Sequence, residues 1–142
     1  MNMYKYKLNL LFDRKTLGDK NIMGSVGIPR VLNMYEDYPF WHKFFTSLGF
    51  DVVLSDESNR EIYEKGISSI SSETACYPAK IAHGHIENLV EKNLDMIFYP
   101  AVFYENKEDE EADNHLNCPV VAGYSEVIKH NVEELKGEDI LF

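Results

Sequence analysis

The sequence predicts an α/β fold, because short apolar runs typical of strands alternate with longer segments that carry apolar residues at helical spacing. Four runs are typical of core strands, at residues 25–28, 50–54, 94–99 and 119–124. The first and third run into Pro29 and Pro100, and proline lacks the N–H needed to continue a ladder. Helices between parallel strands cover both faces of a sheet. We therefore expect a three-layer Rossmann-like or flavodoxin-like sandwich, with a mostly parallel sheet of about four strands.

The clearest predicted helix follows the first strand. Four apolar residues share one helical face at i, i+3, i+4 and i+7, namely Trp41, Phe44, Phe45 and Leu48. Pro39 fits the first turn of this helix, and Gly49 fits its C-terminal cap. Core packing accounts fully for this pattern, so no ligand is needed to explain it.

Three further helices are predicted along the chain. Ser58 and Glu61 form a capping box that starts a short helix ending before Gly66. Pro78 opens a longer helix with an apolar stripe, and another helix is expected around 126–131. These helices supply the layers on either side of the predicted sheet.

The N-terminal segment is predicted to be separate from this core. Residues 4–10 alternate apolar and polar types, which is typical of a half-buried strand, and residues 13–21 are mostly polar. We therefore expect an N-terminal strand and linker over residues 1–21 and a single α/β domain over residues 22–142, with no internal repeat.

Composition excludes several classes of partner. The 142 residues include 24 Asp and Glu against 14 Lys and Arg, a net charge of −10. This balance argues against a nucleic acid and against an anionic membrane surface. No apolar run approaches the ~20 residues that span a bilayer, so a cytoplasmic location is expected. Homo-oligomerisation stays open.

The two cysteines, Cys76 and Cys118, are the candidate metal ligands. Cys76 lies two residues before Pro78, close to the N–H groups of a helix start, where a thiolate that binds metal or reacts is favoured; packing as a small buried residue is the equal alternative. Cys118 is the weaker candidate, because a parallel fourth strand would place it at the opposite, amino edge of the sheet. Two thiols are too few for a four-thiolate iron–sulfur cluster, so the isolated domain is expected to hold none.

Ligands in open parallel sheets bind beyond the carboxyl ends of the strands. This rule selects Arg30 and Asn33, which follow the first strand, as candidate cofactor-binding residues. The planar guanidinium of Arg30 suits a phosphate or carboxylate, and a salt bridge to one of the many acids is the equal alternative. His85 falls in an apolar helical stripe and is expected to be a hydrogen-bonded core histidine, with His83 at the edge of that stripe. The acidic run at 105–113 predicts a solvated loop or a docking surface for a basic partner.

Several stretches, read together, resemble one family. They are the segments at 27–35, 38–41, 48–56, 76–80, 83–85, 97–100 and 117–119. The chain resembles, over roughly residues 22–132, the uncharacterised CoA enzyme activase-type domain of acyl-CoA dehydratase activase-related proteins. Those proteins are related to the 2-hydroxyglutaryl-CoA dehydratase activator.

The resemblance implies a context for the domain within a larger multidomain protein. In such proteins ATPase domains precede it and a dehydratase-like region follows, and ATP hydrolysis drives a low-potential electron between iron–sulfur clusters. Cys76 matches a cluster-cysteine position, while Ala101 stands where relatives often carry a second cysteine. The resemblance therefore implies an accessory domain that shapes or flanks a [4Fe-4S] site shared with those neighbouring domains, with no complete catalytic site of its own. A purely structural or docking domain is the alternative.

Overall fold

The computed structural model describes residues 2–15, 22–137 and 140–142. Its elements follow in order: α1 Met3–Phe12, β1 Gly24–Ile28, α2 Met34–Ser47, β2 Phe50–Leu54, α3 Arg60–Lys65, η1 Ile67–Ser69, α4 Tyr77–Val90, β3 Met96–Ile97, α5 Pro119–Asn131 and η2 Glu133–Lys136. The predicted α/β class is confirmed.

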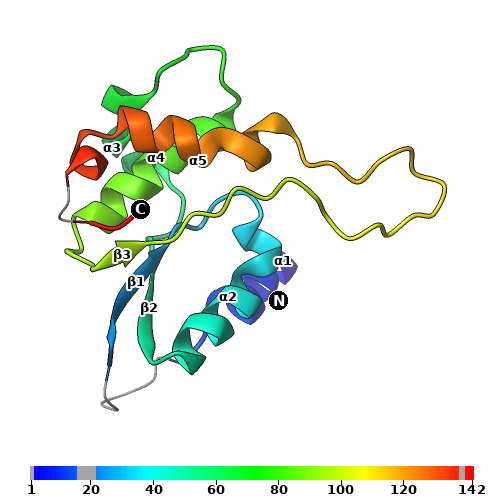
Figure 1. Cartoon of the computed structure of the whole chain (residues 1–142), viewed down its shortest axis with the longest axis horizontal. Helices are drawn as coiled ribbons and strands as arrows, with labels where there is room; N and C mark the ends of the chain where they lie inside the picture. The colour runs from blue at the N-terminus through cyan, green and yellow to red at the C-terminus, as the bar shows by residue number, and fades with distance from the viewer. Residues whose placement is uncertain (1, 16–21, 138–139) are drawn as a thin grey trace.

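The three strands form one parallel sheet in the order β2-β1-β3 (Figure 1). Strand β1 pairs with β2 from Gly24↔Phe50 to Ile28↔Leu54, and with β3 at Val26↔Met96. The carboxyl ends of the strands therefore lie together at one edge, from which the loops leading to α2, α3 and the long 98–118 segment depart.

Side chains alternate between the two faces of this sheet, as the pleat requires. Val26, Ile28 and Val52 pack with residues of α1 and α2. Val53 and Ile97 pack on the opposite face with residues of α4, α5 and η2. The predicted three-layer arrangement is confirmed, with a three-stranded sheet at its centre.

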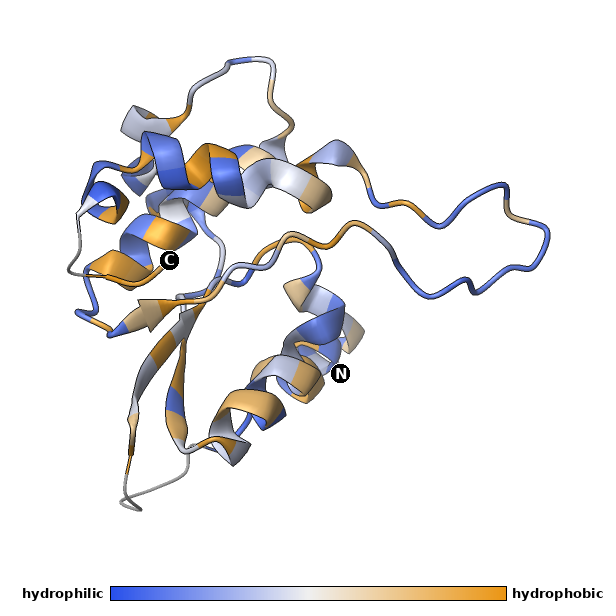
Figure 2. Cartoon of the chain, viewed as in Figure 1, coloured by the Kyte–Doolittle hydropathy of each residue, from blue (hydrophilic) through white to orange (hydrophobic). Residues whose placement is uncertain are grey.

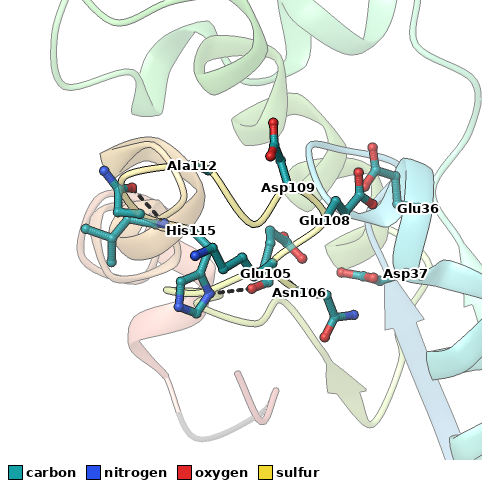
Figure 3. A pocket seen from close by; sticks show the side chains of 11 residues that line it. Glu36, Asp37, Glu105, Asn106, Glu108, Asp109, Ala112 and His115 are labelled. Carbon is teal, nitrogen blue, oxygen red and sulfur yellow. Dashed lines mark hydrogen bonds between the residues drawn. The ribbon is translucent and has the colours of Figure 1, made fainter.

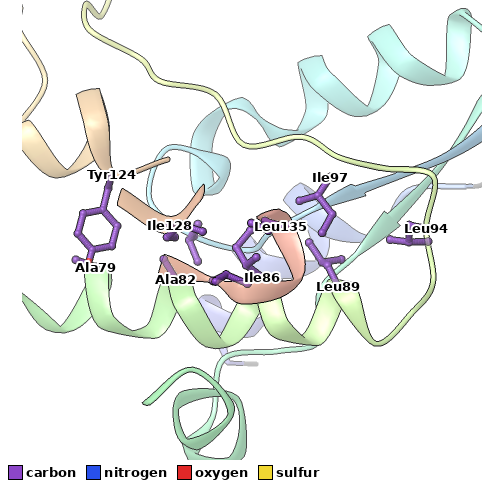
Figure 4. Close-up of a cluster of buried hydrophobic side chains, with 11 residues drawn as sticks. Ala79, Ala82, Ile86, Leu89, Leu94, Ile97, Tyr124, Ile128 and Leu135 are labelled. Atoms are coloured by element: carbon purple, nitrogen blue, oxygen red, sulfur yellow. The ribbon is translucent and has the colours of Figure 1, made fainter. Parts of the chain in front are cut away.

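The larger core cluster lies between α4, α5 and the sheet. Figure 4 shows Tyr124, Ile128 and Leu135 following one another above Ala79, Ala82 and Ile86 along α4. Helix α5 and the η2 turn therefore run in the same direction as α4.

Helix α3 packs on the outside of α4 through a close backbone contact. A Cβ atom added at Gly84 would lie 1.7 Å from the carbonyl oxygen of Ile62, and one added at Gly66 would lie 2.2 Å from the backbone nitrogen of Gly84. No side chain fits at either position. Gly84 therefore stands between His83 and His85 because α3 approaches α4 at this point.

The predicted N-terminal strand is wrong, since residues 3–12 form helix α1. The Asn2 side chain accepts hydrogen bonds from the backbone N–H groups of Tyr4 and Lys5, which caps the helix, and Phe12 is buried beside Tyr38. Residues 16–21 of the predicted linker lie outside the described residues.

The predicted fourth strand is also wrong, because Pro119 opens helix α5 instead. The apolar run that suggested a strand supplies the buried face of a helix, in which Tyr124 and Ile128 are four residues apart. Strand β3 is shorter than predicted, and Leu141 of the C-terminal segment makes a parallel bridge to its Met96. The C-terminal segment thus lies at the edge where another strand would pair.

Two helix starts differ from the predictions. Helix α2 begins at Met34, so Pro39 lies inside it, and Phe44 and Leu48 stay 45% and 49% exposed. Helix α3 is capped by Asn59, whose side-chain oxygen accepts the N–H of Ile62, in place of Ser58. Its predicted end at Gly66 is confirmed.

The long segment between β3 and α5 extends outward as an arm (Figure 1). Its outer part is strongly hydrophilic (Figure 2), and its base is joined by an antiparallel bridge between Tyr104 and Leu116. Throughout the described ranges, no helix combines the length and apolar character that a membrane crossing demands.

Candidate functional site

Both cysteines are N-caps of helices. Cys76 precedes α4 with φ −64° and ψ 156°, and Cys118 precedes α5 with φ −63° and ψ 154°, so the two residues share one backbone conformation. Each helix has a proline in its first turn. Both thiols are free and exposed. Each sulfur therefore stands at the positive end of a helix dipole, where negative charge is stabilised.

The two helix starts lie at the same end of one helical layer. His83 of α4 and Tyr124 of α5 are joined by a hydrogen bond of 3.1 Å between Nε2 and the hydroxyl oxygen. His83 is seven residues after Cys76, and Tyr124 is six residues after Cys118. Because α5 runs in the same direction as α4 (Figure 4), this near-equal spacing places the two cysteines beside each other.

The prediction that Cys118 lies at the amino edge of the sheet is therefore wrong. It depended on a parallel fourth strand, whereas residues 119–131 form a helix parallel to α4. Helix α4 returns from the carboxyl edge to β3, as a parallel crossover requires. The starts of both helices, with Cys76 and Cys118, accordingly lie at the carboxyl edge.

A half-buried tyrosine with a buried hydroxyl lies near Cys118. Tyr99 follows β3, and its hydroxyl has no hydrogen-bond partner among the described residues. Burial raises its pKa strongly, with the charges of Tyr124 and Cys118 adding to the effect. Burial also raises the pKa of Tyr124, with a smaller contribution from Cys76. The Tyr99 hydroxyl is thus a donor near Cys118 that has no acceptor among the described residues.

These residues fit part of an iron–sulfur ligand set. A four-thiolate cluster takes four cysteines, and this chain has two. Within residues 2–15, 22–137 and 140–142, no group of three or more His, Cys, Asp or Glu side chains could hold a metal ion. A cluster at this edge would therefore take its remaining ligands from outside the chain.

Arg30 lies directly after β1, at the same edge. Its guanidinium carbon lies 4.9 Å from the centre of the Phe12 ring, and its Nη1 lies 3.7 Å from Oε1 of the exposed Glu57. Its Nε is buried and without a partner in the described part of the chain. The contact to Glu57 is longer than a hydrogen bond, and Glu57 is exposed, so this ion pair contributes little to the stability of the fold.

Arg30 adjoins a buried hydrogen-bond chain that the sequence did not reveal. The backbone N–H of Arg30 donates to Ser55 Oγ at 2.8 Å. Ser55 Oγ lies 2.8 Å from Nδ1 of His85, and Nε2 of His85 lies 2.8 Å from Ser58 Oγ. His85 is fully buried, and this burial lowers its pKa to about 4. The expected core role of His85 is confirmed, and Ser58 links it to the surface.

His83 is also a core residue, because its exposure is 0%. Its Nδ1 lies 2.9 Å from Ser69 Oγ, and its Nε2 contacts Tyr124. Burial lowers the pKa of His83 to about 4 as well. Both histidines are therefore neutral at pH 7, and they are hydrogen-bonded rather than directed at a ligand.

Asn33 contacts the arm. Its Nδ2 donates to Oε1 of Glu105, which also accepts from Nδ2 of Asn117 at 2.7 Å. These bonds hold the base of the arm against the start of α2. The assignment of Asn33 to cofactor binding stays a prediction.

An acidic cavity of about 440 Å³ lies between α2 and the arm (Figure 3). Its wall includes the carboxylates of Glu36, Asp37, Glu105, Glu108 and Asp109. Burial raises the pKa of Asp37, with further contributions from the charges of Glu105 and Glu36. The concentration of negative charge suits a cationic partner.

Nearly the whole chain matches one known family. A sequence profile of the CoA enzyme activase uncharacterised domain family matches residues 25–141. The chain belongs to this family. Searches of curated proteins and of solved structures gave no significant match.

Membership of the CoA enzyme activase family confirms the resemblance seen in the sequence. The matched range contains α2 to η2 and both cysteines. Of the residues named from the sequence, the structure brings Arg30, Cys76 and Cys118 to one edge. Sequence reasoning missed Ser58 and Tyr99 as members of that edge, because their neighbours are distant in the chain.

Proposed function

We propose that this CoA enzyme activase domain is an accessory part of an ATP-driven, iron–sulfur-dependent activator or reductase of the 2-hydroxyacyl-CoA dehydratase type. The domain flanks a [4Fe-4S] site that it shares with adjacent ATPase and dehydratase-like domains. It supplies thiolate ligands and a polar edge, and has no complete catalytic site of its own.

One observation carries this proposal: the two cysteines cap neighbouring parallel helices at the ligand-binding edge of the sheet. Both thiols are exposed at helix N-termini, so a cluster held at this edge of the sheet would find them accessible. The Tyr99 hydroxyl, which has no partner in the described part of the chain, supports the same role, because it would offer a donor to a sulfur atom that reached it. When bound, a cluster of this kind supplies low-potential electron transfer.

Position 101 offers a direct test. Relatives often carry a cysteine where this chain has Ala101, and the neighbouring Val102 N–H donates to the carbonyl oxygen of Val121 at 3.4 Å in the first turn of α5. Residue 101 therefore lies near the start of α5. A cysteine there would add a third thiol to the pair.

The experiment uses the full-length protein that contains this chain, purified without oxygen. Iron content and reductase turnover are measured for Cys76→Ala, Cys118→Ala and Ala101→Cys. We expect both alanine variants to lose iron and turnover, and Ala101→Cys to retain iron more firmly. Thr74→Ala, an exposed change two residues before Cys76, is the matched control. Unchanged iron and turnover in both alanine variants would reject the ligand role.

The second candidate function is docking without a metal site, favoured by the acidic cavity beside α2. In this case the domain positions its neighbours through charge. Neutralising Glu108 and Asp109 together would then weaken assembly with a basic partner domain, measured by co-purification at low salt. The cysteine variants would keep full turnover, and Glu126→Gln on α5 is the control for loss of one exposed acid.

A further inference from the structure

A second cavity lies at the same edge, beside the start of α4, and Tyr77 and Pro78 of its wall directly follow Cys76. Its volume is about 210 Å³, which is below the range of about 300–1,000 Å³ for pockets that hold drug-sized molecules. Its lining combines few polar groups with many apolar ones: Arg30, Val31, Leu32, Tyr35, Ser58, Tyr77, Pro78 and Ile81. The cavity therefore suits a small molecule with an apolar body.

The direction of the hydrogen bonds from Ser55 through His85 determines whether the Ser58 hydroxyl can donate a hydrogen bond into this cavity. Ser55 is 1% exposed, and its Oγ already accepts the backbone N–H of Arg30. Among the described residues, Nδ1 of His85 is the acceptor available to the Ser55 hydroxyl proton, because no other acceptor contacts that oxygen. His85 is therefore protonated at Nε2 and donates to Ser58 Oγ.

Ser58 then keeps its own hydroxyl proton. Besides His85, the described residues bring the Tyr35 hydroxyl to 3.5 Å from Ser58 Oγ, which is too long for a strong bond. The Ser58 hydroxyl thus remains a donor at the cavity wall. For the same reason Ser58 is not an activated nucleophile, because Nε2 of His85 carries a proton and cannot act as its base.

Arg30 provides the charge that complements this donor. It lines the cavity, its Nε has no partner in the described ranges, and its side chain is only 19% exposed. The ring of Phe12 and the backbone bond to Ser55 hold it in place. A guanidinium together with a hydroxyl donor recognises a carboxylate or a phosphate.

The walls distinguish between these two anions. The lining also includes the hydrocarbon side chains of Val31, Leu32, Pro78 and Ile81, and a phosphate ion has no apolar part to bury against them. Burial of an alkyl chain against such walls is favourable, because it removes apolar surface from water. A carboxylate that carries a short alkyl chain uses both parts of the cavity.

We propose that this cavity binds a small aliphatic monocarboxylate, held by the Arg30 guanidinium and the Ser58 hydroxyl. The site needs no iron and no other domain, so it does not rest on the proposed function. Glu57, whose carboxylate lies 3.7 Å from Arg30, competes with the ligand for the guanidinium.

The test is a titration of the full chain with butyrate, inorganic phosphate and n-butanol, followed by ¹H–¹⁵N NMR. We expect butyrate to shift the resonances of Arg30 and Ser58 and to bind more tightly than phosphate, while butanol has no effect. Arg30→Gln should weaken butyrate about tenfold or more, as loss of a hydrogen bond to a charged group does. Arg60→Gln, an exposed arginine change on α3, is the control and should not alter binding.

Two further variants test the roles of Ser58 and Glu57 in binding. Ser58→Ala should weaken butyrate, but it also removes the partner of His85 and could disturb folding. Glu57→Gln changes a side chain that is 79% exposed, and it should strengthen binding. The proposal is overturned if the chain does not bind butyrate, if phosphate binds more tightly, or if Arg30→Gln binds butyrate as tightly as the unchanged chain does.

Discussion

His83 Nε2 lies 3.1 Å from the hydroxyl oxygen of Tyr124, and this contact joins the two helices that begin at the two cysteines. Both partners are buried, so the bond is shielded from water. It fixes the offset of α5 along α4. The position of Cys118 relative to Cys76 follows from that offset.

The hydrogen bonds predict opposite tautomers for the two buried histidines. Ser69 donates its hydroxyl proton to the Gly66 carbonyl oxygen, so it accepts from Nδ1 of His83, which leaves Nε2 to accept from Tyr124. His85 is instead protonated at Nε2. Burial lowers both pKa values to about 4, so both rings should stay neutral as the pH falls from 7 and gain a second proton only as it approaches about 4.

Long-range ¹H–¹⁵N NMR of the labelled chain checks these tautomers. Tyr124→Phe should perturb Nε2 of His83 and leave the His85 nitrogens unchanged. A ring that gains its second proton near the ordinary value of about 6.5 would contradict the assignment.

Gly84 is predicted to tolerate no side chain. Gly84→Ala would bring a Cβ atom within 1.7 Å of the Ile62 carbonyl oxygen, so α3 would have to move away from α4. We expect the free energy of unfolding, measured with urea, to fall by about 3 kcal/mol or more.

Gly123 gives the matched control for this change. A Cβ atom at Gly123 meets no atom of the described residues within 4 Å, so Gly123→Ala in α5 should stabilise the chain by about 1 kcal/mol through helix propensity. Equal effects of the two substitutions would show that the close contact between α3 and α4 is absent.

Glu87 is predicted to make stability fall as the pH rises. Burial raises its pKa to about 7, with the charges of Glu134 and Glu91 adding to the effect. The folded chain holds this proton more tightly than the unfolded chain does. The free energy of unfolding is therefore highest below about pH 4.5, where Glu87 is protonated in both states, and it falls as the pH rises towards 7. Glu87→Gln removes that loss.

Urea unfolding at pH 4.5 and pH 8 measures the effect of Glu87→Gln. Its side chain is only half-buried, so solvent screening reduces the expected gain at pH 8 to about 1 kcal/mol, with little difference at pH 4.5. Glu61→Gln on the exposed face of α3 is the control. An equal gain in stability at both pH values would show that the titration of the Glu87 carboxyl is not the cause of the gain.

Much of the fold follows from local patterns. The runs that became β1 and β2 end at a proline or a turn and are rich in β-branched residues, so they specify strands. Helix α4 has a proline in its first turn and one apolar stripe. The family resemblance followed from short motifs spread over the same elements.

The errors arise where local patterns fit two structures. Residues 4–10 alternate as a strand would, yet Leu8 and Leu11 also lie on the α2-facing side of a helix. The run after Pro119 is typical of a buried strand or a buried helix, and packing against α4 decides for the helix. The place of Cys118 depends on how the arm returns, which no local pattern specifies.

The central claim is that Cys76 and Cys118 lie side by side at the carboxyl edge, and spin labelling of both native thiols tests it most directly. Continuous-wave EPR of the doubly labelled chain should show strong dipolar broadening, which is absent when Cys76→Ala or Cys118→Ala leaves a single label. Cysteines at opposite edges would be separated by a strand of five residues, about 16 Å, plus the reach of the labels. A doubly labelled spectrum equal to the sum of the two single-label spectra would contradict the account.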